Sequence, residues 1–570
     1  MAQAQHGPDG AIRLKQVSFT LSGPTTASSS AASSPSATPP PISLRDGYFL
    51  AKAAQNDDDV GCRPMDVYDA TLPAWRAAVR RVLVAQIRIE SVLVAKMQDA
   101  IRTPFLDSYF VYSSALGTHT FFMTFLPMLF FFGYPELGRG LIVVLCLGIW
   151  FTSVVKDLFC APRPFAPPVT RLTMGTHHLE YGMPSTHSAN AVSLALLFWA
   201  YIHELAFPLS TTQSPSVSYP AYVALTISLA VYATSIVFGR LYTGMHSLSD
   251  CIVGVLVGAF FWLAHTSFPG IPFSLTLPLP TPYTLNATLL RGWGCGALLD
   301  EWVLRTPSSL RVPFTIIPLA LLAVNQHPQP VDDCPCFEDA IALGSVVLGM
   351  FLGRWGAVRW AGHVPGASII MPGSGWVLSD EGWTPIERDW SDVGIWWAAA
   401  IAKMVFGILV IFAWRLLAKA ALHRTLPPTF RFLATLMRLP HRRFYTPATD
   451  YTAVPPVDAL RRPIPSVIDL PSTAVGVEVG GIGSGAAPLS NGDLNGKPRR
   501  RKAEAVEAAR GGGAHVQDSE GVDDVNGGEV KHYDAAVLTK VFVYAGIGLL
   551  ACEVMPVLFE KFGWGVRWWP

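Results

Sequence analysis

The hydrophobic residues of this chain gather in long runs that few charged residues interrupt. Five such runs fall in the first half of the chain, at residues 114–132, 140–155, 189–207, 221–238 and 251–267. Each approaches the ~20 residues with which a helix crosses the ~30 Å hydrocarbon core of a bilayer. Because a segment inside the bilayer must satisfy its own backbone hydrogen bonds, we expect all five runs to be membrane-spanning helices.

The hydrophobic pattern is weaker beyond residue 269. A Pro-rich stretch there leads to further apolar runs at residues 312–324, 340–352, 395–417 and 541–559. The first two of these runs are short and contain Pro or Gly, so the pattern gives a range for the number of spans instead of a single value. The whole chain is therefore predicted to be all-α, a polytopic membrane helical bundle of about eight to ten spans.

The segments between and around these runs divide the chain further. Residues 1–72 are rich in Ser, Ala and Pro and are predicted to form a disordered tail. Residues 73–102 mix apolar positions with several arginines, too many to span, and predict an amphipathic helix in the membrane interface. The remaining parts are a five-span core at 103–268, additional spans and loops at 269–422, a disordered loop at 423–535 and a C-terminal span at 536–570.

Composition supports a membrane protein and gives no sign of nucleic-acid binding. Of the 570 residues, 51% are hydrophobic and 15% are charged, and the formal net charge is +1. An ordinary soluble domain is less apolar than this, so the bilayer is the expected partner; protein partners are not indicated. The eight cysteines lack zinc-site spacing and are expected to be structural thiols, with Cys334-Pro-Cys336 a weak candidate for any function and a disulfide scaffold not expected.

Three short polar clusters interrupt the core, at residues 156–164, 184–187 and 240–250. Two apolar runs separate the second cluster from the third, so the chain returns to the side of the membrane that it left. All three clusters are therefore predicted to meet at one face. They bring three cations together there, Lys156, Arg163 and Arg240, and such a group suits a multiply charged anion, of which phosphate is the common one.

The histidines of these clusters suggest a reaction. His246 and Asp250 are four residues apart, so in a helix that begins near Met245 the carboxylate accepts a hydrogen bond from one ring nitrogen. The other nitrogen is then free to attack phosphorus and to form a phosphohistidine. His187 stands as the general acid that protonates the leaving alkoxide and then activates water.

This scheme needs no metal or other cofactor, and the sequence contains no HExxH motif, no P-loop and no Asp pair at metal-ligand spacing. Each residue taken singly also has a structural interpretation, for example as a cation anchored at the membrane interface. Three clusters in order, with two spans between the last two, favour the functional interpretation. Outside the clusters, His119, His203 and His265 are interpreted as structural. For His177 and His178 in the loop, contact with a substrate headgroup is the minor alternative to a structural role.

The pattern K-x6-R-P, P-S-x-H and R-x5-H-x3-D resembles the three-part signature of the type 2 phosphatidate phosphatase and vanadium haloperoxidase superfamily. Within it, the wording Cys-Ala-Pro-Arg-Pro at 160–164 and Glu-Tyr-Gly-Met-Pro-Ser-Thr-His at 180–187 is similar to that of sphingosine-1-phosphate and long-chain-base phosphate phosphatases. The resemblance covers roughly residues 101–265. One departure is Gly239, where the superfamily commonly has Ser before the Arg of the third cluster.

The resemblance implies a type 2 phosphatidic acid phosphatase-like catalytic core that acts as a lipid phosphomonoesterase. It assigns the nucleophile to His246, its orienting group to Asp250 and the general acid to His187. The phosphate cradle that it implies consists of Lys156, Arg163, Ser185 and Arg240.

The predicted function is hydrolysis of sphingoid long-chain base 1-phosphates, a lipid phosphate substrate, to the free base and phosphate. Three alternatives stay open: a broader phosphatase of lipid phosphates or isoprenoid pyrophosphates, a catalytically silent scaffold or transporter of the same fold, and a transferase that uses a second lipid as acceptor. Assays on side-by-side substrates distinguish them.

Two indications of orientation conflict. Basic residues precede the first span, among them Arg80, Arg81, Arg88, Lys96 and Arg102. The positive-inside tendency places them, and the site two spans later, in the cytosol. The resemblance instead implies a site on the lumenal face of the endoplasmic reticulum membrane. We follow the resemblance, because charge bias is a tendency and an interfacial helix obscures it.

Overall fold

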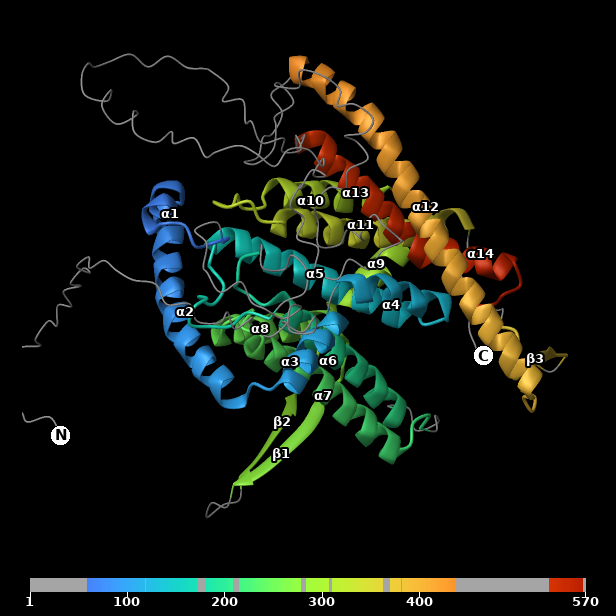
Figure 1. The fold of residues 1–570 in the computed structure, drawn as a ribbon. Coiled ribbons are helices and arrows are strands. Elements are labelled where there is room, and N and C mark those ends of the chain that lie inside the picture. Colours follow the sequence, from blue (N-terminus) through green and yellow to red (C-terminus); the bar gives the residue numbers. More distant parts are fainter. Residues whose placement is uncertain are drawn as a thin grey trace, which may run out of the picture. The chain divides into compact units, whose positions relative to one another are not determined.

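Helices dominate the structure, as the apolar runs predict (Figure 1). The computed structural model describes residues 59–117, 119–172, 180–208, 215–277, 283–306, 310–361, 370–380, 382–436 and 533–566. All of these residues belong to one unit, Tyr48–Pro570. Most of the predicted tail (residues 1–58), His177 and His178, and residues 437–532 of the predicted loop lie outside the described residues.

Up to His265, every regular element of the described residues is a helix. Its elements are α1 (Met65–Thr71), α2 (Ala74–Ile101), α3 (Pro104–Ser113), the 3-10 turn η2 (Ser114–Gly117), α4 (His119–Phe131), α5 (Pro135–Phe159), α6 (Thr186–Ala206), α7 (Tyr219–Tyr242) and α8 (Leu248–His265).

From Ile271 onward the chain combines helices with two small antiparallel hairpins, which the prediction of an all-α chain did not include. Its elements are β1 (Ile271–Leu277) paired with β2 (Tyr283–Leu289), α9 (Cys295–Arg305), α10 (Arg311–Asn325), α11 (Cys336–Ala361), β3 (Trp376–Ser379) paired with β4 (Gly382–Pro385), α12 (Trp390–Leu436), α13 (Tyr533–Leu549), the π-helical segment η6 (Leu550–Val554) and α14 (Met555–Lys561).

Among the described residues, seven helices are long and apolar enough to cross a membrane: α5, α6, α7, α8, α11, α12 and the continuous segment Ala535–Lys561. An eighth span results if α3 and α4, which are bent by 48° across η2, count as one. The described spans therefore reach the predicted range of eight to ten only at its lower limit. The run at 312–324 forms α10, an apolar helix of 15 residues that is shorter than a span.

Helices α6 and α8 are pressed together at two glycines. A Cβ atom at Gly254 would lie 2.4 Å from the carbonyl oxygen of Ser185, and one at Gly258 would lie 2.4 Å from that of Ala189. Glycines four residues apart let the backbones of apolar helices approach closely. Because Ser185 immediately precedes α6, this contact holds the second polar cluster against α8, the helix that the third cluster opens.

Helix α5 is shared by the two halves of the chain. It packs against α6 and α8 on one side and against α11 on another. Leu145 belongs to a hydrophobic cluster with Trp262 of α8, whereas the next residue, Cys146, belongs to a second cluster with Met555 of α14. The additional spans are therefore packed directly onto the helix that carries Lys156 near its end.

The last part of the predicted disordered tail, residues 1–72, is ordered. Met65–Thr71 forms α1, and the Tyr68 side chain is fully buried. Its hydroxyl donates a hydrogen bond of 2.7 Å to Asp332, and the guanidinium of Arg80 lies over its ring. An ordered segment hidden in a polar tail is explained by this long-range anchoring, which the local composition does not reveal.

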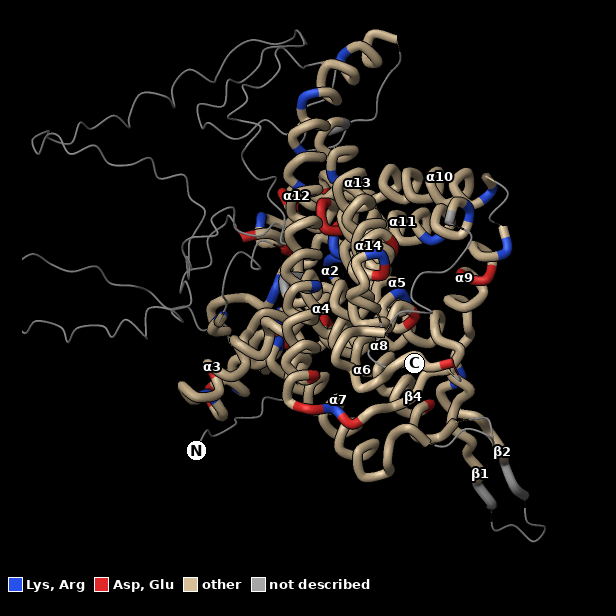
Figure 2. The backbone as a smooth tube through the Cα atoms, turned by 90° about the vertical axis from the view of Figure 1, so that its right-hand side faces the viewer, with Lys and Arg blue, Asp and Glu red and all other residues tan. Residues whose placement is uncertain are grey.

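The predicted disordered loop begins too early. Helix α12 continues through Pro427 and Pro428 to Leu436, whereas the composition placed the start of the loop at residue 423. Figure 2 shows Lys and Arg residues spaced along this far part of α12. Their side chains belong to Arg415, Lys419, Arg424 and Arg431.

We predict that Gly258→Leu destabilises the protein, because the new side chain must push the backbones of α6 and α8 apart. Overpacking of this kind costs about 2 kcal/mol or more, which in a thermal unfolding measurement in detergent lowers the melting temperature by several degrees. The matched control is Gly394→Leu on α12, where nothing lies within 4 Å of the added Cβ. Equal melting temperatures for the two variants would contradict the close contact of α6 and α8.

Candidate active site

The three polar clusters converge because each one stands at a helix end. Lys156 lies in the last turn of α5 and Arg240 in the last turn of α7. Ser185 caps the start of α6, and His246 directly precedes Ser247, the cap of α8. The prediction that all three clusters meet at one face of the bundle thus agrees with this topology.

Arg163 connects the first cluster to the third. Its Nη1 donates a hydrogen bond of 2.7 Å to the carbonyl oxygen of Met245 and lies 3.1 Å from Nε2 of His246. A guanidinium can only donate, so Nε2 of His246 accepts and keeps its lone pair directed toward the cation. The nitrogen expected to attack phosphorus therefore faces a phosphate-binding side chain.

The environment of His246 keeps the imidazole neutral. The side chain is almost completely buried, and this burial, together with the positive charges of Arg163 and Arg240, holds the pKa of His246 well below 6.5. Burial also lowers the pKa of Arg163, to about 10. This value is still well above 7, and the residue remains a cation at neutral pH. A neutral imidazole among cations is suited to act as a nucleophile toward an anion.

Asp250 differs from the prediction. Its Oδ2 lies 3.7 Å from Nδ1 of His246, which is beyond hydrogen-bonding distance. The same oxygen accepts a hydrogen bond of 2.8 Å from the backbone amide of Ser247, and the Ser247 hydroxyl accepts one from the amide of Asp250. The helix begins at Leu248, after His246, so the four-residue spacing does not place both side chains on one helical face. Asp250 completes a capping box with Ser247 at the start of α8.

Lys156 is held by a residue that the sequence interpretation did not single out. Its ammonium donates to Oε2 of Glu180 at 2.6 Å and to the hydroxyl of Thr186 at 2.9 Å. The backbone carbonyl of Glu180 also accepts a hydrogen bond of 2.9 Å from Nε of Arg163. The signal available in the sequence was the position of Glu180, an acidic residue only four residues before the Pro-Ser-Thr-His motif.

Arg240 is the least engaged cation of the site. Its guanidinium is buried, yet Nε and Nη2 have no hydrogen-bond partner among the described residues. It is close enough to Arg163 and to His246 to repel positive charge on both. Buried donors without acceptors are costly, so this side chain is prepared for an anion.

Ser185 joins the second and third clusters. Its backbone amide donates a hydrogen bond of 3.0 Å to the carbonyl of Asp250, and its hydroxyl accepts one of 3.0 Å from Ser188. His187 lies two residues further on, in the first turn of α6, where a Cβ atom added at Gly117 of η2 would come within 3.2 Å of its ring. The bend between α3 and α4 therefore lies directly beside the predicted general acid.

The Gly239 departure has a packing explanation. A Cβ atom at this position would lie 3.0 Å from the ring of Phe110 on α3. Phe110 in turn packs against Tyr242. The space that a serine side chain needs is thus filled by an aromatic ring.

Helix α2 connects all of these loops. Gln98 donates hydrogen bonds of 2.8 Å to the carbonyls of Thr170 and Tyr242. Glu90 accepts hydrogen bonds of 3.0 Å from the amide and the hydroxyl of Ser249. The helix was predicted correctly, but the buried polar side chains show that one of its faces serves to fasten the polar clusters, a role that the amphipathic pattern did not reveal.

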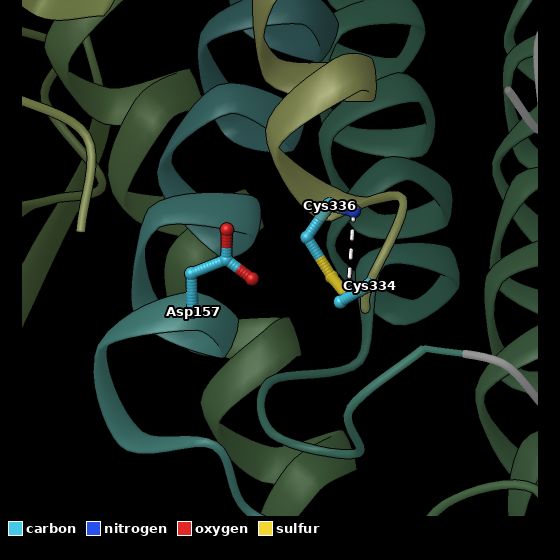
Figure 3. A group of neighbouring side chains, drawn as sticks. All are labelled: Asp157, Cys334 and Cys336. Carbon is cyan, nitrogen blue, oxygen red and sulfur yellow. Dashed lines mark hydrogen bonds between the residues drawn. A yellow bond between two sulfur atoms is a disulfide. The ribbon is translucent and has the colours of Figure 1, made fainter. Parts of the chain in front are cut away.

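A second group of buried side chains lies one residue beyond Lys156. Asp157, Cys334 and Cys336 place their ligand atoms within 4.8 Å of one another, as Figure 3 shows. Cys334 and Cys336 are joined in a disulfide, contrary to the expectation of thiols, and a disulfide offers no thiolate to a metal. Asp157 is instead 2.9 Å from Nε2 of His327. The other six cysteines are not disulfide-bonded.

The histidine predicted to be structural on α6 has a structural role. Nδ1 of His203 lies 3.1 Å from the hydroxyl of Tyr222. His265 packs tightly against Gly140 and Gly296 at the other end of α8. Both lie far along their helices from the site residues at the opposite ends.

Comparison with known proteins gives consistent matches. Residues 137–270 match the family model described as PAP2 superfamily. A dihydrosphingosine 1-phosphate phosphatase of Saccharomyces cerevisiae is 32% identical over 53% of this chain and 66% of its own length. A dihydrosphingosine 1-phosphate phosphatase of Schizosaccharomyces pombe is 31% identical over 63% of this chain and 73% of its own length. The mouse sphingosine-1-phosphate phosphatase 2 is 31% identical over 36% of this chain and 61% of its own length.

The buried neutral His246 predicts a pH effect on stability. The unfolded chain protonates this residue near pH 6.5, whereas the folded protein resists protonation until a lower pH, so the unfolded state binds more protons below 6.5 and the stability that this residue contributes is lost as the pH falls. The difference in melting temperature between the wild type and His246→Gln should therefore shift in favour of the variant between about pH 7.5 and about pH 5.5. A difference that stays constant over this range would show that the imidazole is not held neutral.

Proposed function

Since this chain belongs to the PAP2 superfamily and groups within it with the sphingosine and dihydrosphingosine 1-phosphate phosphatases, we propose that it removes phosphate from sphingoid long-chain base 1-phosphates. It is a phosphoric monoester hydrolase. The choice of substrate rests on the named relatives, and the mechanism rests on the geometry of the site.

The observation that carries the mechanism is the buried guanidinium of Arg240, whose Nε and Nη2 have no hydrogen-bond partner among the described residues, next to the contact between Arg163 and His246. A phosphate placed there receives hydrogen bonds from both arginines and meets Nε2 of His246. An anion bound between the two buried guanidinium groups relieves their mutual repulsion, and this explains why they lie close to each other.

The proposed reaction has two steps. Nε2 of His246 attacks phosphorus, a bond between nitrogen and phosphorus forms, and the bond from phosphorus to the ester oxygen breaks as His187 donates a proton to the leaving alkoxide. In the second step His187 takes a proton from water, the resulting hydroxide attacks phosphorus, and inorganic phosphate leaves His246. Lys156, Arg163 and Arg240 hold the oxygens on which charge accumulates.

A lipid substrate suits the position of the site. The polar clusters lie at the ends of apolar helices, so a headgroup reaches them while the hydrocarbon tail remains among lipids. The exposed side chains of α3 are large and apolar, Phe105 and Tyr112 among them. Tyr112 lies two residues before η2, the turn whose Gly117 adjoins the ring of His187.

The proposed function predicts metal-independent phosphate release by the purified protein in detergent micelles. Dihydrosphingosine 1-phosphate should be hydrolysed much faster than phosphatidate, and His246→Ala should abolish turnover of both because the nucleophile is removed. Equal turnover of the two lipids would be consistent with the mechanism but would contradict the proposed preference for sphingoid base 1-phosphates. Turnover by His246→Ala at the wild-type rate would exclude the assignment of the nucleophile.

We further propose that the protein resides in the endoplasmic reticulum membrane with its site on the lumenal face. The Cys334–Cys336 disulfide supports this orientation, because it lies beside Asp157 at the end of α5 that carries Lys156. Disulfides persist in oxidising compartments and are rare in the cytosol.

The basic residues favour the opposite orientation less strongly than their number suggests. Several of those that precede the first span are engaged in local contacts: Arg80 donates to the carbonyl of Cys160, Arg81 pairs with Asp69, and Arg102 pairs with Asp107. Charge bias is a statistical tendency, and we give the disulfide more weight.

Glycosylation provides the test of orientation. Helix α8 begins at the site and leads to the hairpin that carries Asn286 in the sequence Asn-Ala-Thr, so with a lumenal site this residue faces the cytosol and should carry no glycan. Asp69→Asn creates the same sequence in α1, which is anchored at the catalytic side, and this variant should acquire a glycan that endoglycosidase removes. A glycan on Asn286 in the wild type and no additional glycan on the Asp69→Asn variant would place the site in the cytosol.

A further inference from the structure

Glu180 is a carboxylate within a site for an anion. Its Oε2 lies 2.6 Å from Nζ of Lys156 and 3.8 Å from Nη2 of Arg163. The side chain is nearly buried, with 11% of its surface exposed. Two of the three cations expected to hold phosphate therefore already have a negative charge beside them.

This arrangement disfavours a simple phosphate ester. A phosphate that binds Lys156 and Arg163 must share them with the carboxylate and comes within a few ångströms of it. Both groups are anionic, and like charges at that distance repel strongly where water is largely excluded. A phosphatase for phosphate esters in general gains nothing from a glutamate in this position.

A substrate that carries its own cation removes the repulsion. In a sphingoid base 1-phosphate, C1 bears the phosphate ester and C2 bears a primary amine, so the nitrogen lies about 5 Å or less from phosphorus by ordinary bond lengths. The amine is protonated at neutral pH. An ammonium at this separation reaches the carboxylate while the phosphate reaches the cations. Phosphatidate carries ester oxygens there and has no such group.

We infer that Glu180 binds the ammonium group of the sphingoid substrate and thereby selects amino lipids over other lipid phosphates. This inference rests on the proposed function of the site. The contacts of the site agree with it: Glu180 pairs with Lys156 and lies beside Arg163, so an ammonium bound to its carboxylate stands next to a phosphate held by these two cations.

Three other carboxylates near the site have hydrogen-bond partners outside the cradle. Asp250 accepts from the amide of Ser247 in the capping box of α8. Glu90 accepts from both the amide and the hydroxyl of Ser249. Asp107 accepts from Tyr242 and pairs with Arg102. Of these four, Glu180 is the one whose carboxylate contacts the cations of the cradle.

The experiment compares two substrates of equal chain length, dihydrosphingosine 1-phosphate and octadecyl phosphate, which lacks the amine. The wild type should prefer the amino lipid in kcat/KM. In Glu180→Gln the charged hydrogen bond to the ammonium is lost, and so is the repulsion toward phosphate. The preference should therefore fall by about 10- to 100-fold, with octadecyl phosphate hydrolysed at least as well as by the wild type.

Two further variants complete the design. Glu180→Asp keeps the charge but withdraws it by one methylene, so it should retain part of the preference and provides the comparison if Glu180→Gln folds poorly. Glu301→Gln removes an exposed glutamate that pairs with Arg305 on α9, and it should leave both substrates unaffected.

The outcomes separate this inference from the proposed function. If Glu180 only positions Lys156, both substrates lose turnover in equal proportion, and the inference is overturned while the phosphatase function stands. If the wild type hydrolyses octadecyl phosphate as well as the amino lipid, the proposed substrate fails and the ammonium site fails with it. A selective loss on the amino lipid alone supports both.

Discussion

The burial of three cations at one end of a helical bundle is the constraint on which the rest of this structure depends. Lys156, Arg163 and Arg240 are each less than 5% exposed, and buried charges of one sign are stable only when partners compensate them. Glu180 and the carbonyl of Met245 provide part of this compensation. The remainder is left for the anion that binds. Nε and Nη2 of Arg240 have no acceptor in the described part of the chain, so a bound phosphate that accepts from them stabilises the folded protein.

The polar loops that carry these cations need support, because loops at a helix end have few apolar contacts of their own. Helix α2 provides this support through three side chains. Arg76 donates a hydrogen bond to the backbone at the end of α5, and Gln98 donates one at the end of α7. Glu90 accepts one from the amide of Ser249 at the start of α8. Its opposite face exposes apolar residues, Trp75 and Val82 among them. The helix therefore has a buried polar face and an exposed apolar face. The polar face is the one that supports the site.

The sequence predicted the parts of the structure that follow from local chemistry. Runs of apolar residues located α5 to α8 within a few residues, and the spacing of the clusters brought Lys156, Arg163, Arg240 and His246 to one face. It failed where distant residues decide the outcome. Tyr68 is ordered by Asp332, more than 260 residues away, and Gly239 is explained by Phe110 on another helix. For Asp250 the spacing was correct, but the helix begins two residues after His246, so the carboxylate caps the helix. A spacing of four residues does not indicate where a helix starts.

The additional spans act on the site through α5. Its consecutive residues Lys156 and Asp157 point to different partners: Lys156 to Glu180 in the site, and Asp157 to His327 in the second half of the chain. Asp332, five residues after His327, accepts hydrogen bonds from Tyr68 and Tyr181, which adjoins Glu180. Any shift of the segment around residues 327–336 must therefore move both the end of α5 and the backbone next to Glu180. A five-span core alone would leave these buried carboxylates without their partners, so the second half of the chain is part of the structure that fixes the cations in place.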